Sequence, residues 1–477
     1  MKQLLREFLK SFRSKDKLKP EGPKPKSPEK IGRRPKKINI QVGIDFGTST
    51  TKVAFFQLSS LGSKIQPVLF NHRLKSYPVY CLPSLAAFDG DNNFLLGIEA
   101  AKFLATKPWD SGLRHFKMIV AGKYNDSFHD KTSSQLFSRN LGDNNEIEVE
   151  HVTAAFIAYS IRVSRKLIEE QYPDYQLDFA FNVCIPIDQV QDSKVKPVFD
   201  KILTCSQKIE AQWTHDKNHK ELLDLAKNNL KNAEYDQEDP ETRVFSVPEA
   251  VAEVASYFNS LKSQDGLHAV IDIGAGSTDI SIFNLINIRR ARERSFWYAA
   301  RNLPRGGQRV EKIVFDYGTE TGQELSGALI LNQLSNFEGA PLILKNKIRK
   351  ELNELWEESC SVWREAYGKN RQQSSWERDK VKVFICGGGS NIPIVRDIFK
   401  ESWMSGWGPY PISDLPFEED YNSTNENVPF KRMSVAFGLA RPLPVFKEYV
   451  LPNDCPNQTP APLPQRTPPA DPFWYLE

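Results

Sequence analysis

Two segments of the sequence combine an aspartate with a glycine turn and several hydroxyl side chains. The first runs from Val42 to Ala54 and the second from Ala269 to Ile280. Each consists of an apolar strand, an aspartate, one apolar residue, a glycine, a stretch of small hydroxyl-bearing residues and a second apolar strand. Glycine lets backbone N–H groups close around an anion, and the hydroxyls add further donors. Each segment therefore predicts a β-hairpin whose tip binds phosphate.

The aspartate beside each tip needs a different role, because a carboxylate repels phosphate. Asp45 and Asp272 are suited to face a divalent cation through water, next to the bound phosphate. A single copy could be an ordinary hairpin turn, but the second copy repeats the same order of residue types. Neither segment is a Walker loop or a dinucleotide-binding turn, because the Gly-Lys-Ser/Thr ending is absent and strand-like residues follow.

A third glycine segment runs from Val383 to Pro393, where a buried strand leads into three consecutive glycines and then into a helix start. Bare backbone of this kind suits a flat purine or a ribose. Taken alone, the segment could also be a strand-to-helix turn without a ligand.

Alternating strands and helices predict an α/β fold for the body of the chain. Short apolar runs predict buried strands at Asn39–Asp45, Phe179–Ile185, Ala269–Ile273 and Val381–Cys386. Helical periodicity predicts helices at Thr153–Glu170, Pro248–Ser260 and Asn346–Tyr367. Residues 205–243 are rich in Lys, Asp, Asn and Glu, so we expect an exposed helical insertion there.

The net charge of +3 over 477 residues divides unevenly along the chain. Residues 1–37 hold 14 Lys/Arg against 4 Asp/Glu, a charge of +10, so the remaining residues carry −7. Apolar residues at helical spacing in 1–15 predict an amphipathic basic helix suited to an anionic membrane surface. A solvated helix or a flexible basic arm is an equal alternative. Nucleic-acid binding lacks the aromatic residues that base stacking needs, and Glu7 and Asp16 interrupt a transit-peptide pattern.

Several functional classes are disfavoured. The sequence has no run of about 18 apolar residues for a membrane span and no secretory-signal pattern. Its six cysteines form no Cys-x-x-Cys pair, which favours reduced, packed thiols in a cytosolic protein. His215 and His219 have a ligand-like spacing but lie among Lys and Asp, so we expect a solvated helix face rather than a zinc site.

The three glycine segments, in this order, resemble the phosphate-1, phosphate-2 and adenosine motifs of the actin-like ATPase superfamily. The nearest likeness is to the nucleotide-binding domain of heat-shock-protein-70 (DnaK-type) chaperones. Further segments resemble that domain: Leu82–Phe88, Leu96–Lys102, Phe116–Gly122, Phe181–Pro186, Ser246–Ala252, Arg305–Gln308 and Ser434–Ala440. The resemblance implies an actin-like (ribonuclease H-like) fold, with two lobes around a cleft that holds Mg²⁺ and ATP.

The resemblance also implies a domain organisation. We expect a basic arm at 1–37, lobe I at 38–260 with the charged insertion, and lobe II at 261–430 with the adenosine motif. A closing helix at 431–445 would return to lobe I, and a Pro-rich tail would occupy 446–477. Because about 37 Pro-rich residues follow the body, we expect no β-sandwich for peptide binding.

Residue by residue, the resemblance assigns the nucleotide contacts. The phosphates would be held from the two hairpins by Gly47, Thr48, Ser49, Gly274, Gly276, Ser277 and Thr278. Gly307 would lie in the Gly-Gly turn after the second hairpin. The nucleoside would be faced by Gly388, Gly389 and Ser390.

The resemblance assigns the catalytic groups as well. Asp45 and Asp272 would orient the water shell of Mg²⁺, with Asp279 as a further metal candidate. Lys117 would stabilise the γ-phosphate, and Glu249 would order the attacking water. Plainer alternatives are a surface lysine for Lys117 and a helix-dipole partner for Glu249.

Four departures from the family pattern bear on these assignments. Ala275 stands where the chaperones usually have glycine, Gln308 replaces a usual acidic residue, and Glu357–Tyr367 lacks the spacing that brackets adenine. The short Pro-rich tail is the fourth.

The expected function is a slow, Mg²⁺-dependent ATPase that acts in the cytoplasm as a chaperone-like switch for a partner protein. The alternative is a bacterial actin-like protein that forms filaments or associates with the inner face of a membrane. A small-molecule kinase of the same superfamily is disfavoured by the pattern around Lys117 and Glu249.

Overall fold

The structure is a computed structural model. It describes residues 36–58, 64–89, 91, 93–107, 112–122, 147–214, 218–232, 241–286, 294–322, 341–416, 428–442 and 448–455. The chain divides into two compact units. Unit 1 comprises residues 1–256 and 417–445, and unit 2 comprises 257–416 and 446–477. The first division falls four residues before the expected boundary at 260, and the chain returns to unit 1 at 417 rather than at 431.

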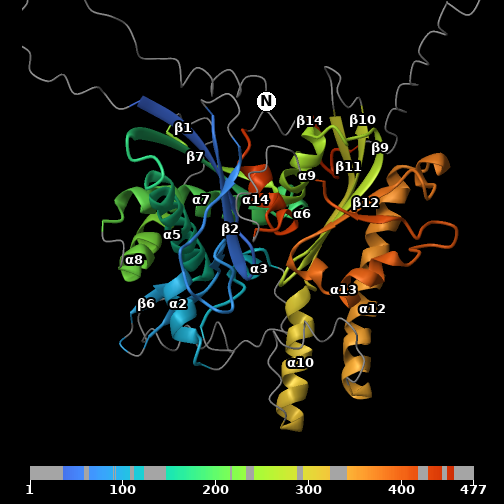
Figure 1. Cartoon of the computed structure of the whole chain (residues 1–477), viewed down its shortest axis with the longest axis horizontal. Helices are drawn as coiled ribbons and strands as arrows, with labels where there is room; N and C mark the ends of the chain where they lie inside the picture. Colours follow the sequence, from blue (N-terminus) through green and yellow to red (C-terminus); the bar gives the residue numbers. More distant parts are fainter. Residues whose placement is uncertain are drawn as a thin grey trace, which may run out of the picture. The chain divides into compact units, whose positions relative to one another are not determined.

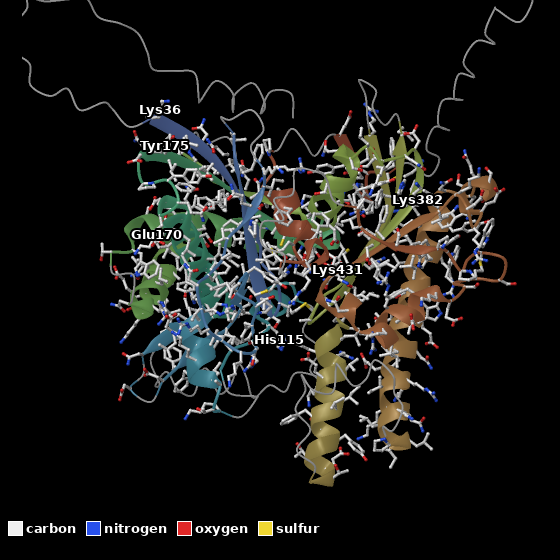
Figure 2. All side chains as sticks on the ribbon, viewed as in Figure 1. Lys36, His115, Glu170, Tyr175, Lys382 and Lys431 are labelled. Atoms are coloured by element: carbon white, nitrogen blue, oxygen red, sulfur yellow. The ribbon has the colours of Figure 1, made fainter. Side chains whose placement is uncertain are left out.

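Unit 1 is built on a six-stranded sheet with the order β3-β2-β1-β7-β8, in which β4 also pairs with β2. Its strands are β1 (Lys36–Asp45), β2 (Thr50–Gln57), β3 (Gln66–Pro67), β4 (Cys81–Pro83), β7 (Tyr175–Ile185) and β8 (Val244–Pro248). β1 is antiparallel to β2 and parallel to β7, and β7 is parallel to β8. Figure 2 labels Lys36 and Tyr175, which begin the β1–β7 pairing.

Three helices of unit 1 pack on one another beside β1 and β7 (Figure 1): α5 (Val149–Glu169), α7 (Val195–Gln212) and α8 (His219–Leu230). The short helix α14 (Ser434–Leu439) packs on β1 at Gly43, where a Cβ would lie 2.3 Å from the backbone nitrogen of Ala440. Asn182 of β7 donates from Nδ2 to the carbonyl oxygen of Leu439 at 2.7 Å. A helix from the end of the unit 1 sequence therefore packs on strands from its beginning and middle.

The rest of unit 1 contains a small hairpin of β5 (Ala86–Phe88) and β6 (Phe94–Leu96) and several short elements. These are α2 (Gly97–Leu104), α3 (Phe116–Val120), α6 (Ile187–Val190) and η4 (Phe430–Arg432). α9 (Glu249–Asn259) begins in unit 1, and its last residues belong to unit 2.

Unit 2 has a six-stranded sheet with the order β13-β12-β9-β10-β11-β14. Its strands are β9 (Gly266–Ile273), β10 (Thr278–Ile286), β11 (Arg294–Leu303), β12 (Lys382–Cys386), β13 (Ile412–Asp414) and β14 (Glu448–Val450). The helices are α10 (Gly307–Thr321), α12 (Leu342–Lys369), α13 (Pro393–Asp397), η1 (Gln373–Trp376), η2 (Gly388–Asn391) and η3 (Ile398–Lys400). In Figure 1, α10 and α12 run side by side as two long helices.

Five strands of each six-stranded sheet follow one order, and only β4 in unit 1 and β14 in unit 2 lie outside it. In unit 1 the strands run third-second-first-fourth-fifth, as β3-β2-β1-β7-β8, and in unit 2 the same order appears as β11-β10-β9-β12-β13. In both, the first three strands are antiparallel neighbours, and the fourth and fifth run parallel to the first. Each Asp-containing glycine segment forms the hairpin of the first two strands.

The structure confirms the mixed α/β class and each of the strands and helices expected from apolar runs and periodicity, to within a few residues at their ends. All six cysteines are buried and free, as expected for packed thiols. Among the described residues, no helix combines the length and apolar character that crossing a membrane requires. The expected amphipathic helix at 1–15 lies outside the described residues.

Two expectations about the charged region were wrong. The described parts of 205–243 are not an exposed insertion, because α7 and α8 bury one apolar face against α5, including Ile209, Leu222 and Leu223. His219 does not face solvent: it is 5% exposed, and its Nδ1 accepts a hydrogen bond from the Leu96 backbone at 3.0 Å. Burial lowers the pKa of this imidazole.

The limits expected for the arm and the tail also need correction. β1 begins at Lys36, so the last two residues of the predicted arm belong to the sheet of unit 1. The predicted tail contributes β14, which pairs in parallel with β11 of unit 2. Cys455 then joins the apolar core of unit 2. A Pro-rich composition predicted non-helical chain here but gave no sign of a sheet partner.

Candidate functional site

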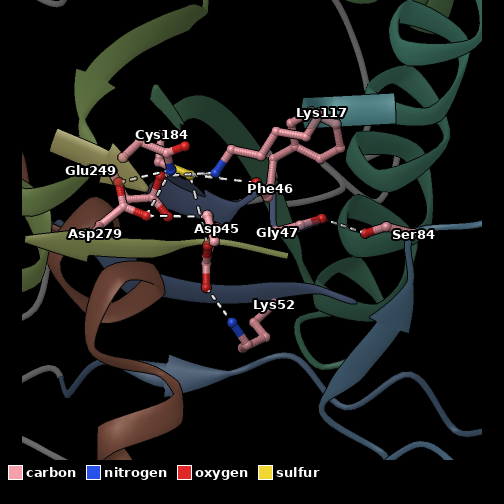
Figure 3. Close-up of polar contacts among 11 residues, drawn as sticks. Asp45, Phe46, Gly47, Lys52, Ser84, Lys117, Cys184, Glu249 and Asp279 are labelled. Atoms are coloured by element: carbon pink, nitrogen blue, oxygen red, sulfur yellow. Dashed lines mark hydrogen bonds and ion pairs between the residues drawn. The ribbon is translucent and has the colours of Figure 1, made fainter. Parts of the chain in front are cut away.

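The hairpin tip of unit 1 places a carboxylate and an ammonium group opposite each other. Asp45 ends β1 and is 4% exposed, and its partner in the strand register is Lys52 of β2. Lys52 Nζ lies 2.5 Å from Asp45 Oδ2 (Figure 3). The charge of Asp45 is therefore already balanced within its own hairpin.

Ser84, just after β4, fixes the shape of this tip. Its hydroxyl donates to the carbonyl oxygen of Gly47 at 2.8 Å (Figure 3), and its backbone nitrogen donates to the carbonyl oxygen of Ser49 at 2.9 Å. Gly47 is required by space, because a Cβ there would lie 2.3 Å from the Thr50 carbonyl oxygen. The predicted phosphate-binding residues Gly47, Thr48 and Ser49 thus form a turn that hydrogen bonds from Ser84 hold in place. All three are partly exposed.

A second group of polar side chains meets beside Asp45. Lys117 of α3 forms an ion pair with Glu249, the first residue of α9, with Nζ 2.8 Å from Oε2. Both are buried, with side-chain exposures of 6% and 9%. Cys184 of β7 completes the group: its Sγ lies 3.9 Å from Lys117 Nζ and 3.7 Å from Asp45 Oδ1. Figure 3 shows these side chains converging from separate elements.

Electrostatics in this group favour a charged lysine and a neutral thiol. Burial alone lowers the pKa of Lys117, but the negative charges of Glu249 and Asp45 act in the opposite direction, and the net pKa of Lys117 is raised. Burial, followed by the charge of Glu249, raises the pKa of the Cys184 thiol well above its usual value. At neutral pH the group therefore holds an ammonium between carboxylates, with a protonated thiol alongside.

α3 owes its position to a residue in an unusual backbone conformation. His115 precedes this helix at φ 59°, in the left-handed region that non-glycine residues rarely adopt. The next residue, Phe116, packs on Phe46 and on Phe156 of α5, with ring centroids 5.7 and 5.1 Å away. A tight turn and an aromatic contact together direct Lys117 to Glu249.

Asp45, Cys184 and Glu249 have donor atoms within 4.8 Å of one another, as metal ligands would. Magnesium prefers an octahedral shell of oxygen atoms, whereas this set contains a sulfur atom whose raised pKa keeps it protonated. The ammonium groups of Lys52 and Lys117 already neutralise Asp45 and Glu249, respectively. The set fits an internal ion pair better than a resident Mg²⁺.

The hairpin tip of unit 2 pairs two carboxylates instead. Asp272 of β9 faces Asp279 of β10 in the strand register, and Asp279 in turn faces Asn302 of β11. Asn302 Nδ2 lies 3.0 and 2.9 Å from the two oxygens of Asp279, so a neutral amide holds that carboxylate. Adjacent carboxylate oxygens suit a hard divalent cation, and this pair fits Mg²⁺ better than the group in unit 1.

Three glycine-containing turns of unit 2, at Gly274, at Gly307 and at Gly387–Gly389, meet around this tip. Gly307 donates from its backbone nitrogen to the Gly274 carbonyl oxygen at 3.0 Å, and a Cβ on Gly307 would lie 3.9 Å from the Cα of Gly389. Gly387 has φ +80°, and a Cβ there would lie 1.9 Å from Asp272 Oδ1. The structure thus brings together the segments predicted to bind the second set of phosphates and the nucleoside.

Not every predicted contact residue offers its side chain. Thr278 is fully buried, and its hydroxyl donates to the Arg305 carbonyl oxygen at 2.6 Å. The buried Ser390 hydroxyl donates to the Gly387 carbonyl oxygen at 2.7 Å. Ser277 is buried, with its hydroxyl 3.4 Å from Asp279 Oδ2, and Gly276 is buried while Gly388 is exposed. Their contacts with a nucleotide stay predictions.

Ion pairs of Arg305 hold the Gly-Gly turn at Gly306 and Gly307 in place. Arg305 forms ion pairs at 2.8 Å with Glu351, Glu354 and Glu358 of α12. Burial lowers the pKa of its guanidinium, but the hydrogen bonds to Glu358 and Glu351 outweigh this and raise the pKa. The acidic face of α12 therefore anchors the chain directly before Gly306 and Gly307.

Sequence reasoning gave no role to Lys52, Ser84, Cys184 or Asn302. Lys52 had a usable signal, because it follows Asp45 by seven residues, the same spacing that separates Asp272 from Asp279. In a hairpin, that spacing places the two side chains opposite each other. The positions of Ser84, Cys184 and Asn302 depend on contacts between distant segments, which no local pattern reveals.

A scan against models of protein families and a search of curated proteins both found no match for this chain.

Proposed function

We propose that this protein binds and slowly hydrolyses ATP with Mg²⁺, using an actin-like fold in which each unit is one lobe. On this proposal it acts as an Hsp70-like, nucleotide-driven switch for a partner protein. The observation that carries the proposal is the repeated topology. Two sheets of the order third-second-first-fourth-fifth each end their first hairpin in a glycine tip beside an aspartate.

The groups in unit 1 suit phosphoryl transfer. Lys117 would place an ammonium against the γ-phosphate, and Glu249, now its ion-pair partner, would accept a hydrogen bond from the attacking water. Gly47, Thr48 and Ser49 would donate from backbone and hydroxyl groups. Positioning and charge stabilisation supply most of the rate in such reactions.

The groups in unit 2 suit close approach of the nucleotide. Gly274, Gly307 and Gly389 lie near one another and have no Cβ to hold a ligand away from the backbone. Asp272 and Asp279 would hold the water shell of Mg²⁺, which when bound would neutralise charge on the phosphates.

Isothermal titration calorimetry of the full chain with ATP and MgCl₂ tests the proposal. We expect binding by the wild type and a loss of about tenfold or more for Asp272→Asn, which removes one of the two carboxylates assigned to the water shell of Mg²⁺ and keeps the shape of the side chain. Asp316→Asn is the matched control, since that aspartate pairs with Lys312 on α10. Phosphate release should be measurable but slow in the wild type and lower in Glu249→Gln.

Two outcomes would overturn the proposal. One is an absence of heat with ATP for a wild-type protein that is folded by circular dichroism. The other is an Asp272→Asn variant that binds ATP with MgCl₂ as the wild type does.

A further inference from the structure

The junction between β6 and α2 in unit 1 is attached to α8 through a histidine side chain. Leu96 ends β6, and Gly97 begins α2. The backbone nitrogen of Leu96 donates to Nδ1 of His219, the first residue of α8, at 3.0 Å. Gly97 has φ +57°, and a Cβ there would lie 2.6 Å from Cε1 of Tyr159 on α5. Two helices therefore hold this junction, one by a hydrogen bond and the other by close packing.

The hydrogen bond lies in an apolar environment. Leu96 is fully buried and His219 is 5% exposed. The imidazole meets the ring of Tyr159 edge-on at 5.0 Å between centroids and lies 6.3 Å from the ring of Trp213, at the end of α7. A buried backbone N–H group that loses its acceptor is costly, because water does not replace the lost bond. The state of the imidazole therefore decides how firmly the junction is held.

The hydrogen bond requires a neutral ring. Nδ1 of a histidine accepts a hydrogen bond only while it carries no proton, and in the imidazolium both ring nitrogens are donors. Protonation of His219 therefore sets one N–H group against the N–H group of Leu96. Histidine is the side chain whose ordinary pKa, about 6.5, brings this change close to neutral pH.

Two ionisable side chains from neighbouring helices lie close to His219. Glu99, in the first turn of α2, accepts a hydrogen bond from the Tyr159 hydroxyl at its Oε2, at 3.2 Å. Burial lowers the pKa of His219, and the negative charge of Glu99 opposes this lowering. Burial also raises the pKa of Tyr159 well above its usual value, so the phenol stays neutral. Glu99 is therefore the group that favours the imidazolium.

The other neighbours of the imidazole do not change this description. Leu96 of β6 and Trp213 of α7 carry no ionisable group. On α8 itself, Lys220 is exposed, and Glu221 accepts hydrogen bonds from the residue that follows Trp213. Residues 215–217 lie outside the described residues. Their charges can shift the pH at which the ring is protonated, but the loss of the acceptor at Nδ1 does not depend on them.

We propose that His219 is a pH-sensitive switch: the neutral ring holds the β6–α2 junction on α8, and the protonated ring releases it. The switch is closed at neutral pH and opens as the pH falls below about 6.5, because the closed form disfavours the proton. Glu99 raises the pH at which the switch opens. The backbone nitrogen of Gly97 donates to the carbonyl oxygen of Leu85 at 2.9 Å, so the released segment adjoins Ser84.

Hydrogen–deuterium exchange of the full chain, measured at the Leu96 amide, tests the switch. After correction for the intrinsic pH dependence of exchange, we expect the wild type to lose about tenfold in protection between about pH 7.5 and pH 5. His219→Asn keeps an acceptor one bond from Cγ, where Nδ1 lies, but does not titrate, so its protection should not change with pH. His219→Phe has no acceptor and should show low protection at both pH values.

His151→Asn is the matched control. His151 lies on α5, and its Nδ1 accepts from the Glu148 backbone nitrogen at 3.0 Å, so it binds a backbone group in the same way as His219. Burial lowers its pKa as well. This variant should keep the wild-type response at Leu96, because the histidine it replaces does not contact the β6–α2 junction.

Glu99→Gln tests what sets the pH of opening. Glutamine keeps an acceptor for the Tyr159 hydroxyl but removes the negative charge that favours the imidazolium. The midpoint of the pH response at Leu96 should therefore move to lower pH, whereas a purely structural role for Glu99 would change the protection at every pH alike.

Four results would overturn the proposal. They are equal protection of Leu96 in the wild type at both pH values, a wild-type response in His219→Asn, loss of the response in His151→Asn, and an unchanged or raised midpoint in Glu99→Gln. If His219→Phe does not fold, His219→Asn decides alone. The experiment contains no nucleotide, so its outcome is independent of the ATPase proposal.

Discussion

In unit 1 the residue across the hairpin from Asp45 is Lys52, whereas in unit 2 the residue across from Asp272 is Asp279. The two hairpins have the same position in the five-strand order that the sheets share, and the same spacing of seven separates these side chains. An opposite-charge pair across two strands is stabilising, and a like-charge pair is destabilising. Unit 2 therefore uses an extra neutral group, Asn302, to hold Asp279.

The residues around the two hairpin tips also differ in charge. Unit 1 gathers buried charges, with Lys117 and Glu249 beside Asp45. Unit 2 gathers bare backbone, with Gly274, Gly307, Gly387 and Gly389 near one another. The comparison teaches that one scaffold carries two kinds of site, a charged one and a glycine-lined one. Under the ATPase proposal, the first would stabilise the transition state and the second would let the nucleotide approach the backbone.

The largest expected effect comes from breaking the buried ion pair of unit 1. Lys117→Met leaves Glu249 as a buried carboxylate without its cation, and loss of one partner of such a pair costs about 3–5 kcal/mol. Lys347→Met is the matched control in unit 2, where an exposed pair with Glu320 is worth about 0–1 kcal/mol. Urea denaturation of both variants measures the difference.

The double variant Lys117→Met/Glu249→Leu sharpens this test. Removing both charges should restore most of the stability, because a well-packed apolar pair can replace a buried ion pair. Equal, small losses in Lys117→Met and Lys347→Met would contradict the description of unit 1 as a site of buried charge.

The next effect concerns the glycine-lined site of unit 2. Gly387 and Gly322 both have positive φ, +80° and +67°, but a Cβ meets Asp272 at 1.9 Å at the first and nothing within 4 Å at the second. Gly322→Ala should cost about 1–2 kcal/mol for the backbone conformation alone. Gly387→Ala should cost about 3 kcal/mol or more, because the new methyl group must displace the carboxylate. Thermal denaturation that ranks the two variants equally would show that this contact is not tight.

Much of this fold could be predicted because its signals are local. The predicted runs within β1, β7, β9 and β12 bury almost every side chain, although the first residues of β1 and β7 are exposed, so each stands out as a mainly hydrophobic stretch. The two hairpin tips were also visible, since glycine, aspartate and hydroxyl residues repeat there in one order.

The remainder depended on contacts between segments far apart in the chain. The sequence of α7 and α8 suggested exposed helices because charged and polar residues outnumber apolar ones in this region. Only the packing of these helices on α5 shows which face is buried. Cys184 had the composition of a core residue, and nothing near it in the sequence indicates Lys117 or Glu249. Sequence reasoning therefore named the lysine and the glutamate by resemblance, while their contact came from the fold.

The smallest expected effect tests how unit 2 treats a buried titratable group. His268 of β9 is 1% exposed, its Nδ1 lies 2.8 Å from the Gly266 carbonyl oxygen, and its Nε2 lies 2.9 Å from the hydroxyl of Tyr257. Nδ1 then carries the proton and donates to Gly266, and Nε2 accepts a hydrogen bond from the Tyr257 hydroxyl. With one protonated nitrogen, the ring is neutral. Burial lowers the pKa of His268 to about 3 and raises that of Tyr257 to about 12. Unit 1 keeps Lys117 charged, whereas unit 2 keeps this histidine neutral.

The sign of the pH dependence follows from the depressed pKa. Above about pH 6.5 the ring is neutral in both folded and unfolded chains, so its stabilising contribution is fully present. As the pH falls, the unfolded chain takes up a proton that the folded chain refuses until about pH 3, and stability is lost. Between pH 7 and pH 5 this loss amounts to about 2 kcal/mol. Urea denaturation at both pH values should therefore show a smaller loss in His268→Gln than in the wild type, since every other titrating group is common to both. Equal losses would mean that His268 is not held neutral, and that the contrast between the two units does not extend beyond their hairpin tips.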